Sequence, residues 1–451
     1  MSGSEQKFWN EAMETLPWRQ VQAWQTRKIA EMLASLPQRS KMYRQLLDGC
    51  SLPTRISSFE DLQALPFTMK EQLREAQTQA SDDQPFGSNQ SVPTRDIVQV
   101  LSSSGTTGQP LSYALTAADV EMFTDAIANA WFTAGVRADD VVAHLVALPM
   151  VAGGLPYADG FRRIGASLCW LGGFPTERIL REMRRLRVTT VLATTSFGLY
   201  LAEHWNDAAS QTGVDSKLRK MLGGGEPGLN QSEIRDRIMR GLSISHVRDA
   251  MGLGDVISAL WSECEQGRGM HFNAQRYVAV ELIDPQSGEA VPWSDGNTGE
   301  LVYTGFARQA TPVLRYRSRD HAQVIAVNCP CGRTSPRITC IGRTDDMLIY
   351  KGMNVFPAAI RDLIVARFAG RIEPLVRIWK DYPTQVRFDD PIAVDVEVSE
   401  GVQTEEFSEL AGKVEHELRA QLQVRVALSI FPKGSLPKGV YKTPLLAVRS
   451  G

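Results

Sequence analysis

The chain has 451 residues, of which 43% are hydrophobic and 22% are charged, as in ordinary folded, water-soluble proteins. Its 49 basic and 51 acidic residues give a formal net charge of -2, so neither nucleic acid nor a membrane is an expected partner. The length exceeds what one hydrophobic core usually supports and predicts two or three domains. The first residues lack a charged leader followed by an apolar core, so the six cysteines are expected to be reduced thiols in the cytoplasm.

The first fifty residues predict a helix. Its apolar residues recur at helical spacing from Ile29 to Leu36, and Pro37 is expected to end the run. From about residue 96, apolar runs rich in β-branched residues alternate with helical patterns. Thr176 is the candidate N-cap of one helix, and a second is expected over 197–205. The predicted strands are 97–101, 141–147, 166–171 and 188–193, and the alternation indicates an α/β core with largely parallel strands.

The chain turns β-rich after residue 277, and its last hundred residues form a separate pattern. Helices are predicted over 357–368 and 405–422, and strands over 392–398 and 425–431. The predicted fold class is therefore α/β. A large N-terminal α/β domain with a β-rich subdomain is expected over residues 1–344, and a small α+β C-terminal domain over residues 345–451. The longest apolar run, 141–158, is interrupted by Gly and Pro and does not predict a membrane helix.

The stretch "LSSSGTTGQP" (residues 101–110) offers many hydroxyl and amide donors on a backbone that can bend around an anion. It lacks the Gly-Lys-Ser/Thr ending of a Walker loop, and strand-like sequence flanks it on both sides. A strand-loop-strand hairpin is therefore expected, without a helix dipole. Taken alone, the stretch also fits a Ser/Gly-rich surface turn.

Five further segments follow it in a fixed order: "GGGEPG" (223–228), "DAMGLGD" (249–255), "LRYRSRD" (314–320), "GRTDDMLIYKGMNVFP" (342–357) and "GSLPKGVYKT" (434–443). In this order and at these separations, the chain resembles the adenylate-forming superfamily of acyl-CoA synthetases. Within it, the chain is most similar to the phenylacetate-CoA ligase branch. The resemblance runs nearly from end to end, and "DDMLIYKGMNVFP" is its most specific piece.

The resemblance implies an ATP-dependent enzyme that activates an aromatic or arylalkanoic carboxylic acid as acyl-AMP. Transfer to coenzyme A would then give acyl-CoA, AMP and pyrophosphate, with Mg²⁺ assisting. Two alternatives stay open: another acceptor, such as a carrier-protein thiol or an amine, or a weakened relative that only binds nucleotide or acyl ligand. The sequence leaves the oligomeric state open, a homodimer included.

The resemblance also implies the site residues. Lys442 would bridge the carboxylate and the α-phosphate, Asp255 would help to hold magnesium, and Asp345 would be the hinge on which a mobile C-terminal domain rotates. Gly352 would line the thiol tunnel. The implied nucleotide-binding set is Ser103, Ser104, Gly105, Thr106, Thr107 and Gly108 in the phosphate loop, Gly225, Glu226 and Pro227 beside adenine, Met251 and Gly252, Asp320 at the ribose, and Arg343 near ribose and phosphate.

Four positions depart from the family pattern. Gln109 stands where a lysine is common, and Met251 replaces an aromatic residue that stacks on adenine. Asp255 replaces a glutamate and keeps the charge at a shorter reach. Arg319 replaces a glycine and adds a positive charge that could partly replace the missing lysine.

The acyl pocket is expected in the apolar segments before "GGGEPG". Glycines beside Tyr and Phe would leave a flat slot for an aromatic acid, although ordinary core packing explains each residue about as well. The candidate lining is Met150, Gly153, Gly154, Tyr157, Ser196 and Phe197.

Four residues are candidate zinc ligands. Cys329 and Cys331 form a Cys-x-Cys pair, and upstream a polar loop carries Cys264 and His271. Three thiolates and an imidazole suit a closed tetrahedral zinc site, and the phenylacetate-CoA ligase branch shows a similar arrangement. Such a site would be structural, since it has no open position for substrate. Buried thiols are the alternative, and that interpretation is preferred for the remaining Cys50, Cys169 and Cys340.

Overall fold

The computed structural model describes residues 6–50, 56–103, 110–146, 150–212, 215–226, 228–351, 353–383, 385–437 and 443–449, with the side chains of 207–212, 345 and 354 left out. The helices are α1 (Glu11–Glu14), α2 (Trp18–Arg39), α3 (Lys41–Leu47), α4 (Lys70–Thr78), α5 (Ala117–Thr133), α6 (Leu155–Ile164), α7 (Thr176–Arg185), α8 (Thr195–Thr212), α9 (Ser232–Leu242), α10 (Pro357–Arg367) and α11 (Phe407–Leu422), with short 3₁₀ turns η1 (Glu60–Ala64), η2 (Thr94–Asp96), η3 (Thr344–Asp346) and η4 (Thr404–Glu406). The strands are β1 (Ile97–Ser102), β2 (Ser112–Thr116), β3 (Val141–His144), β4 (Ser167–Trp170), β5 (Thr190–Ala193), β6 (Lys220–Gly224), β7 (His246–Met251), β8 (Trp261–Glu263), β9 (Met270–Phe272), β10 (Ala279–Ile283), β11 (Thr298–Gly305), β12 (Val313–Ala326), β13 (Arg337–Arg343), β14 (Leu348–Tyr350), β15 (Met353–Val355), β16 (Ile372–Lys380), β17 (Arg387–Phe388), β18 (Ile392–Val398), β19 (Val426–Phe431) and β20 (Leu446–Val448).

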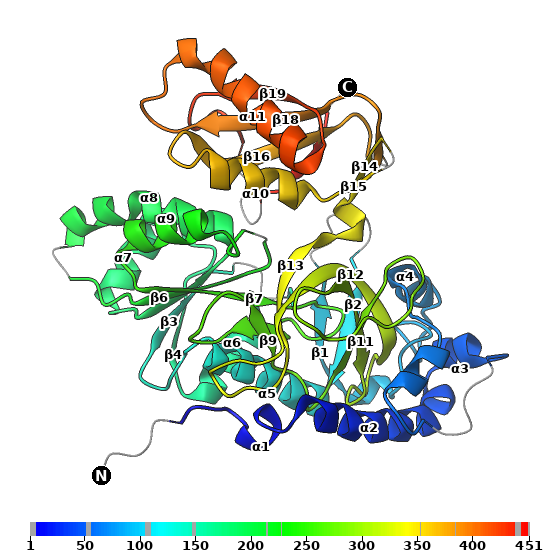
Figure 1. The fold of residues 1–451 in the computed structure, drawn as a ribbon. Helices are drawn as coiled ribbons and strands as arrows, with labels where there is room; N and C mark the ends of the chain where they lie inside the picture. The colour runs from blue at the N-terminus through cyan, green and yellow to red at the C-terminus, as the bar shows by residue number, and fades with distance from the viewer. Residues whose placement is uncertain are drawn as a thin grey trace.

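One mixed sheet runs through the large N-terminal part (Figure 1). Its order is β10-β11-β12-β13-β9-β8-β7-β6-β5-β3-β4. Strands β4, β3, β5, β6 and β7 pair in parallel, and the pairings from β7 to β10 are antiparallel. The predicted parallel α/β core and the β-rich region are thus confirmed, joined edge to edge in a single sheet.

Two apolar cores cover the two faces of the parallel strands. Neighbouring residues of one strand, such as Val142 and Ala143 in β3, belong to different cores. Helices α5 and α6 contribute to the first core, and α7, α8 and α9 to the second. Strands that are buried on both faces read as continuous apolar runs, which is why the sequence revealed them without alternation.

Strands β1 and β2 form the expected hairpin. They pair antiparallel, with Ser102 opposite Ser112 at the end of the ladder. The hairpin therefore brings both ends of the phosphate-loop candidate together, while residues 104–109 themselves lie outside the described residues.

The C-terminal part has its own core, built from β14 to β19 with α10 and α11. Its sheets have the orders β15-β14-β17 and β19-β18-β16-β20. The small α+β arrangement agrees with the predicted fold class, and Figure 1 shows it stacked on the large part, with α10 beside α9 and β13. The domain boundary at residue 345 stays a prediction.

Three local predictions needed correction. Helix α2 continues past Pro37 to Arg39. Pro37 lies in the last turn, where its missing backbone N–H removes one helical hydrogen bond, and Ser40 then caps α3. The N-cap of α7 is Pro175, which has an extended backbone, and Thr176 is the first helical residue. The helix therefore begins one residue earlier than predicted. The predicted elements also omit α5 and α9. Among the described helices, none is long and apolar enough to cross a bilayer.

Candidate active site and cysteine cluster

The carboxyl ends of the parallel strands gather several of the expected site residues. Glu226 follows β6, and its carboxylate accepts hydrogen bonds from the Ser196 backbone N–H (2.9 Å) and hydroxyl (2.7 Å), at the start of α8. The Thr443 N–H of the C-terminal part donates to the same carboxylate at 3.1 Å. Ligands of open α/β sheets bind outside the carboxyl ends of the strands, so this is the expected place for a nucleotide.

Two glycines of the predicted set are required by the backbone. Gly225 has φ of +79°, a left-handed conformation that residues with a Cβ rarely adopt. A Cβ on Gly252 would lie 2.3 Å from the Ser258 carbonyl carbon, so only glycine lets the two chain segments approach so closely. Both requirements are local, and they keep the loops after β6 and β7 in place.

Asp320 and Arg343 face each other across β12 and β13. They are register partners, and Arg343 Nη1 donates to Asp320 Oδ1 at 2.6 Å. The second carboxylate oxygen, Oδ2, is buried and has no hydrogen-bond partner among the described residues. Burial raises the pKa of Asp320, and the Arg343 charge opposes that shift. A buried acceptor without a donor is costly, so this oxygen is suited to a ligand hydroxyl.

Asp255 has a different environment from the one expected of a magnesium ligand. Its carboxylate accepts hydrogen bonds from the hydroxyls of Tyr113 and Tyr316, the latter at 2.8 Å, and it lies 3.5 Å from Lys70 Nζ. Burial, followed by the Asp255 charge, raises the pKa of Tyr316 well above its usual value, which keeps that hydroxyl a donor. Both oxygens are therefore engaged. We assign no metal-dependent step to Asp255, and its magnesium role stays a prediction.

Of the other residues predicted for the nucleotide site, the structure describes some and leaves the others out. The Ser103 hydroxyl accepts the Leu111 N–H at 3.0 Å and closes the base of the β1–β2 loop. Met251 ends β7, half-buried. Arg319 forms an ion pair with Glu71 at 2.8 Å, so much of its charge is already compensated. The predicted residues Ser104, Gly105, Thr106, Thr107, Gly108, Gln109, Pro227, Gly352 and Lys442 lie outside the described residues, as does the side chain of Asp345 within η3.

The acyl-pocket candidates fall into two groups. Gly153 packs against Tyr157, since a Cβ on this glycine would lie 3.4 Å from the Tyr157 ring, and the Tyr157 hydroxyl donates to the Ser258 carbonyl at 2.6 Å. Met150 is exposed, and Gly154 is the N-cap of α6. In the second group, Ser196 binds Glu226, and Phe197 stacks on Tyr200 and packs against the second core. Their role as lining stays a prediction.

His144 is a buried histidine that the sequence did not single out. The Val146 N–H donates to its Nδ1 at 3.3 Å, so Nε2 carries the proton and donates to the Gly154 carbonyl at 3.0 Å. The ring also stacks on Trp170, with centroids 4.9 Å apart. A neutral imidazole therefore ties the end of β3 to the loop of the acyl-pocket candidates.

We expect His144 to make stability depend on pH. Burial lowers its pKa from 6.5 to about 4, so the unfolded chain takes up a proton that the folded chain excludes. The stability contributed by neutral His144 is complete above pH 6.5 and is lost as pH falls toward 4, by about 2 kcal/mol between pH 7 and pH 5. Urea unfolding at both pH values should show a smaller loss for His144→Gln than for the wild type. Exposed His416→Gln should keep the wild-type loss, and equal losses in all three proteins would contradict the assignment.

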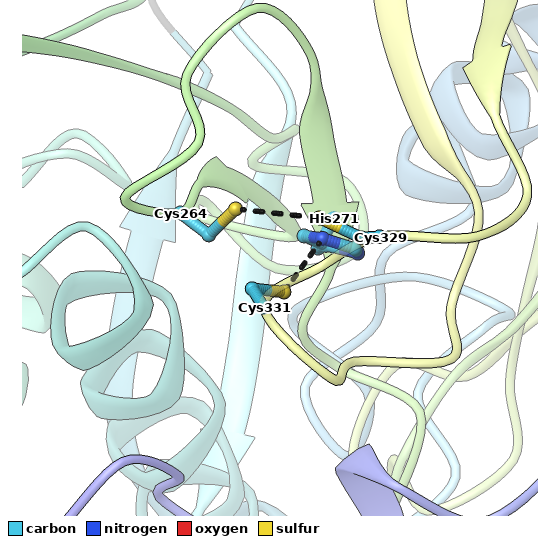
Figure 2. Close-up of side chains that lie close together, drawn as sticks. All are labelled: Cys264, His271, Cys329 and Cys331. Atoms are coloured by element: carbon cyan, nitrogen blue, oxygen red, sulfur yellow. Dashed lines mark hydrogen bonds between the residues drawn. The ribbon is translucent and has the colours of Figure 1, made fainter.

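The four zinc-ligand candidates converge although they come from three chain segments (Figure 2). All ligand atoms of Cys264, His271, Cys329 and Cys331 lie within 4.8 Å of one another. The sulfurs of Cys264 and Cys329 are 3.8 Å apart, and His271 Nε2 is 3.3 Å from Cys331 Sγ. A tetrahedral zinc ion with ordinary Zn–S and Zn–N bonds places its ligand atoms about 3.5–3.8 Å apart. The donor set and its spacing therefore fit a zinc ion.

The surroundings orient these donors. His271 Nδ1 donates to the Ser335 carbonyl at 2.8 Å, which leaves the Nε2 lone pair facing the cysteines. The Arg333 N–H lies 3.4 Å from Cys331 Sγ and donates to it, as is common for a thiolate. Cys264, His271 and Cys331 are fully buried, and the three cysteines of the cluster are free thiols, without disulfide bonds.

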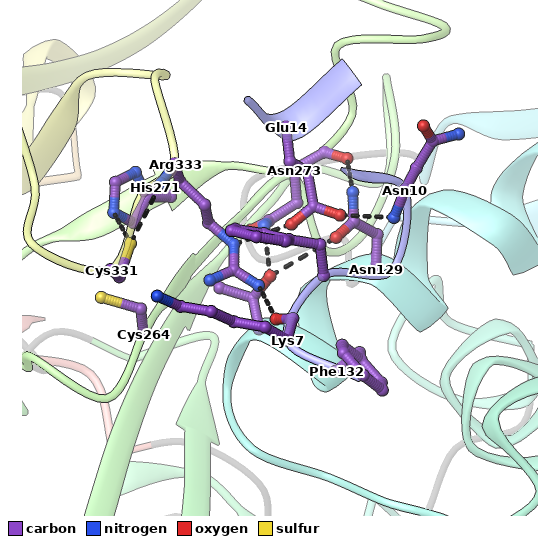
Figure 3. A network of polar contacts seen from close by, with 12 residues as sticks. Lys7, Asn10, Glu14, Asn129, Phe132, Cys264, His271, Asn273, Cys331 and Arg333 are labelled. Carbon is purple, nitrogen blue, oxygen red and sulfur yellow. Dashed lines mark hydrogen bonds and ion pairs between the residues drawn. The ribbon is translucent and has the colours of Figure 1, made fainter. Parts of the chain in front are cut away.

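The cluster also touches the N-terminal segment (Figure 3). Arg333, two residues after Cys331, forms a buried ion pair with Glu14 of α1 at 2.8 Å, and its Nη2 donates to the Lys7 carbonyl at 3.2 Å. The Thr334 N–H donates to the Glu14 carbonyl at 2.9 Å. The loop that carries the cysteines therefore holds residues 7–14 against the large part.

Several of these contacts had no signal in the sequence. Tyr113 and Tyr316 reach Asp255 from 142 and 61 residues away. The pair of Arg333 and Glu14 likewise joins distant segments. Nothing local distinguishes such residues from other aromatic or charged residues.

Comparisons with known proteins agree with the geometry. The chain matches the family described as AMP-binding enzyme over residues 39–307, and the AMP-binding enzyme C-terminal domain over residues 352–446. It is 30% identical to the phenylacetate-coenzyme A ligase of Thermus thermophilus, covering 93% of this chain and 91% of that protein. It is 32% identical to the phenylacetate-coenzyme A ligase of Pseudomonas putida, covering 72% and 71%.

Among solved structures, the chain is similar to 2-hydroxyisobutyryl-CoA ligase in the postadenylation state, with a TM-score of 0.87 and 22% identity, covering 100% of this chain and 94% of that one. At this identity the likeness shows the fold. The fold and site define an adenylate-forming protein. The chain belongs to the AMP-binding enzyme family, in its phenylacetate-CoA ligase-like branch, and the resemblance noted in the sequence is confirmed.

Proposed function

We propose that this protein is an AMP-forming acid–thiol ligase. It activates an aromatic or arylalkanoic carboxylic acid with ATP to give acyl-AMP and pyrophosphate, and it transfers the acyl group to coenzyme A. Membership in the family and the similarity to phenylacetate-coenzyme A ligases support this reaction. Localisation in the cytoplasm, a homodimer and a carrier-protein acceptor stay predictions.

The observation that carries the proposal is the buried Asp320 oxygen. Oδ2 lacks a partner among the described residues, while Oδ1 is fixed by Arg343 at 2.6 Å. An ionised carboxylate is an acceptor only, so it is suited to the two hydroxyls of a ribose. Arg343 then holds the carboxylate in position and adds positive charge beside the phosphates.

The remaining roles follow the chemistry of adenylation. A carboxylate attacks a phosphate slowly because both carry negative charge, so a cation between them lowers the barrier. We assign that role to Lys442. Its neighbour Thr443 donates to Glu226, which supports a tail position close to the nucleotide loop. Alignment of acid and ATP in one site supplies the rest of the rate increase.

The cysteine cluster supplies a second, structural element to the proposal. We assign zinc to Cys264, His271, Cys329 and Cys331, because the donor types and their separations suit that ion. Bound zinc would take part in folding, since four protein ligands leave no position for substrate. The protein residues therefore carry the catalytic chemistry without it.

A pyrophosphate-exchange assay over a panel of aryl and arylalkanoic acids tests the function. Carboxylate-dependent exchange and CoA consumption with the same acid are the expected results. Exchange without CoA consumption would indicate another acceptor. No exchange with any acid, in protein of verified fold and zinc content, would contradict the ligase and favour the binding-only alternative.

A further inference from the structure

Helix α10 of the C-terminal part lies against α9 of the large part. Val365 of α10 is buried in the second core, which also contains Ile234 and Ile238 of α9. One turn earlier on α10, Arg361 lies near Gly228, with Nη1 3.8 Å from where a Cβ on that glycine would be. Figure 1 shows α10 and α9 as the adjoining helices. Small contacts between domains of one chain generally allow relative motion.

An arginine shared by both parts adds charge to this contact. Arg237 of α9 lies one turn from Ile234. Its Nη2 is 2.5 Å from Glu373 Oε2 of β16 and 2.9 Å from Glu203 Oε1 of α8. The Glu373 side chain is 7% exposed and that of Arg237 is 27% exposed, so the interdomain pair is largely shielded from water. Shielding makes such a pair stronger than one on the open surface.

The two carboxylates differ in what happens when the parts separate. Glu203 is on the same part as Arg237, so this pair survives any movement of the C-terminal part. Glu373 belongs to the C-terminal part and would leave with it. Arg237 therefore always retains one counter-charge, and Glu373 would gain water on leaving. The pair can open without stranding a buried charge, which would otherwise cost several kcal/mol.

The position that Arg237 stabilises is the one in which the tail reaches the nucleotide loop, since the Thr443 N–H donates to Glu226 in this arrangement. We propose that Arg237 is a positioning residue. By binding Glu373, it favours the domain arrangement that forms acyl-AMP over the one that transfers the acyl group. This inference rests on the proposed ligase function for its consequence in catalysis, while the contact itself is independent of it.

The experiment compares the half-reactions in Arg237→Gln, Glu373→Gln and wild type. Pyrophosphate exchange reports adenylation, and the reaction of supplied acyl-AMP with CoA reports transfer. Exposed ion pairs contribute up to about 1 kcal/mol, which corresponds to about fivefold, and a partly shielded pair should reach that value. We expect exchange to fall about fivefold in both variants and transfer to be unchanged or faster.

The matched control is Arg371→Gln. It removes an Arg–Glu pair of 2.7 Å between Arg371 and Glu406, which lies wholly within the C-terminal part. Both half-reactions should keep their wild-type rates. Equal losses of exchange and transfer in Arg237→Gln, or unchanged exchange, would overturn the positioning role.

A readout without substrate separates this inference from the proposed function. Amide hydrogen exchange in peptides of α10 should be faster in Arg237→Gln and Glu373→Gln than in wild type or Arg371→Gln. Unchanged exchange in α10 would overturn the inference even if the protein is an active ligase. If the wild type activates no acid, the ligase function fails, and hydrogen exchange still decides whether Arg237 holds the two parts together.

Discussion

Replacing Asp320 with alanine is expected to lower kcat/KM for ATP in pyrophosphate exchange about 10³-fold. The carboxylate is proposed to accept two ribose hydroxyls, and a hydrogen bond to a charged group contributes roughly 1.5–3 kcal/mol. Two such bonds amount to roughly 3–6 kcal/mol, and each 1.4 kcal/mol corresponds to about tenfold. The loss should appear with every acid, because the residue binds the nucleotide and not the acyl group.

Two further variants separate binding from folding. Asp320→Asn keeps the shape but removes the charge and one acceptor, and it should fall between alanine and wild type. Asp82→Asn, on an exposed loop, should keep full activity. Wild-type activity in Asp320→Ala would contradict the ribose assignment. A loss of activity accompanied by a lowered thermal midpoint would instead indicate that the pair with Arg343 is needed for folding.

Removing a ligand of the cysteine cluster is expected to produce the largest loss of stability. Cys331→Ser should lower the zinc content from one ion per chain to nearly none. It should also lower the free energy of unfolding by roughly 4 kcal/mol or more. Zinc binds only the folded chain, so its binding free energy adds to the free energy of unfolding. Metal analysis and the thermal midpoint measure the two effects. Chelation of the wild type should reproduce the loss.

The contacts of Figure 3 extend this prediction to the N-terminal segment. Arg333 follows Cys331 closely and holds Glu14, so the metal-free protein should lose protection from proteolysis near residues 7–14. Cys50→Ser is the matched control, because its thiol donates to the Leu46 carbonyl at 3.3 Å and does not belong to the cluster. Well under one zinc per chain in wild type purified without chelators would contradict the site.

Short-range patterns in the sequence revealed much of the fold. The strand β18 and the helices α7 and α10 agree with prediction to within a residue or so, because each has a clear period or a proline at its start. Helix α5 was missed although Thr116 and Asp119 form a capping box at its start. The helix is buried around most of its circumference, and the buried residues include the polar Thr124, Asn129 and Thr133. It therefore lacks the single apolar stripe that reveals an amphipathic helix.

The sequence could predict which residues gather where the signal is the residue types themselves. Three cysteines and a histidine were enough to predict a cluster, and the structure brings all four within 4.8 Å. The resemblance placed Asp320 and Arg343 near the same ribose, and the structure adds that the two side chains pair directly across β12 and β13. The same approach predicts a magnesium role for Asp255, which stays a prediction, and only the structure shows that Tyr113 and Tyr316 donate to its two oxygens. Neither tyrosine stands near Asp255 in the sequence.

The sequence by itself therefore determined the family and the kind of chemistry, and it supplied candidate residues for that chemistry. These depend on side-chain types and local spacing, which folding does not alter. The tertiary structure alone decided which groups meet. Examples are Ser196 with Glu226 and Arg237 with Glu373, and each pair depends on how strands and helices that are remote in the chain pack together. Such contacts arise from burying apolar surface over the whole molecule, so no local pattern encodes them.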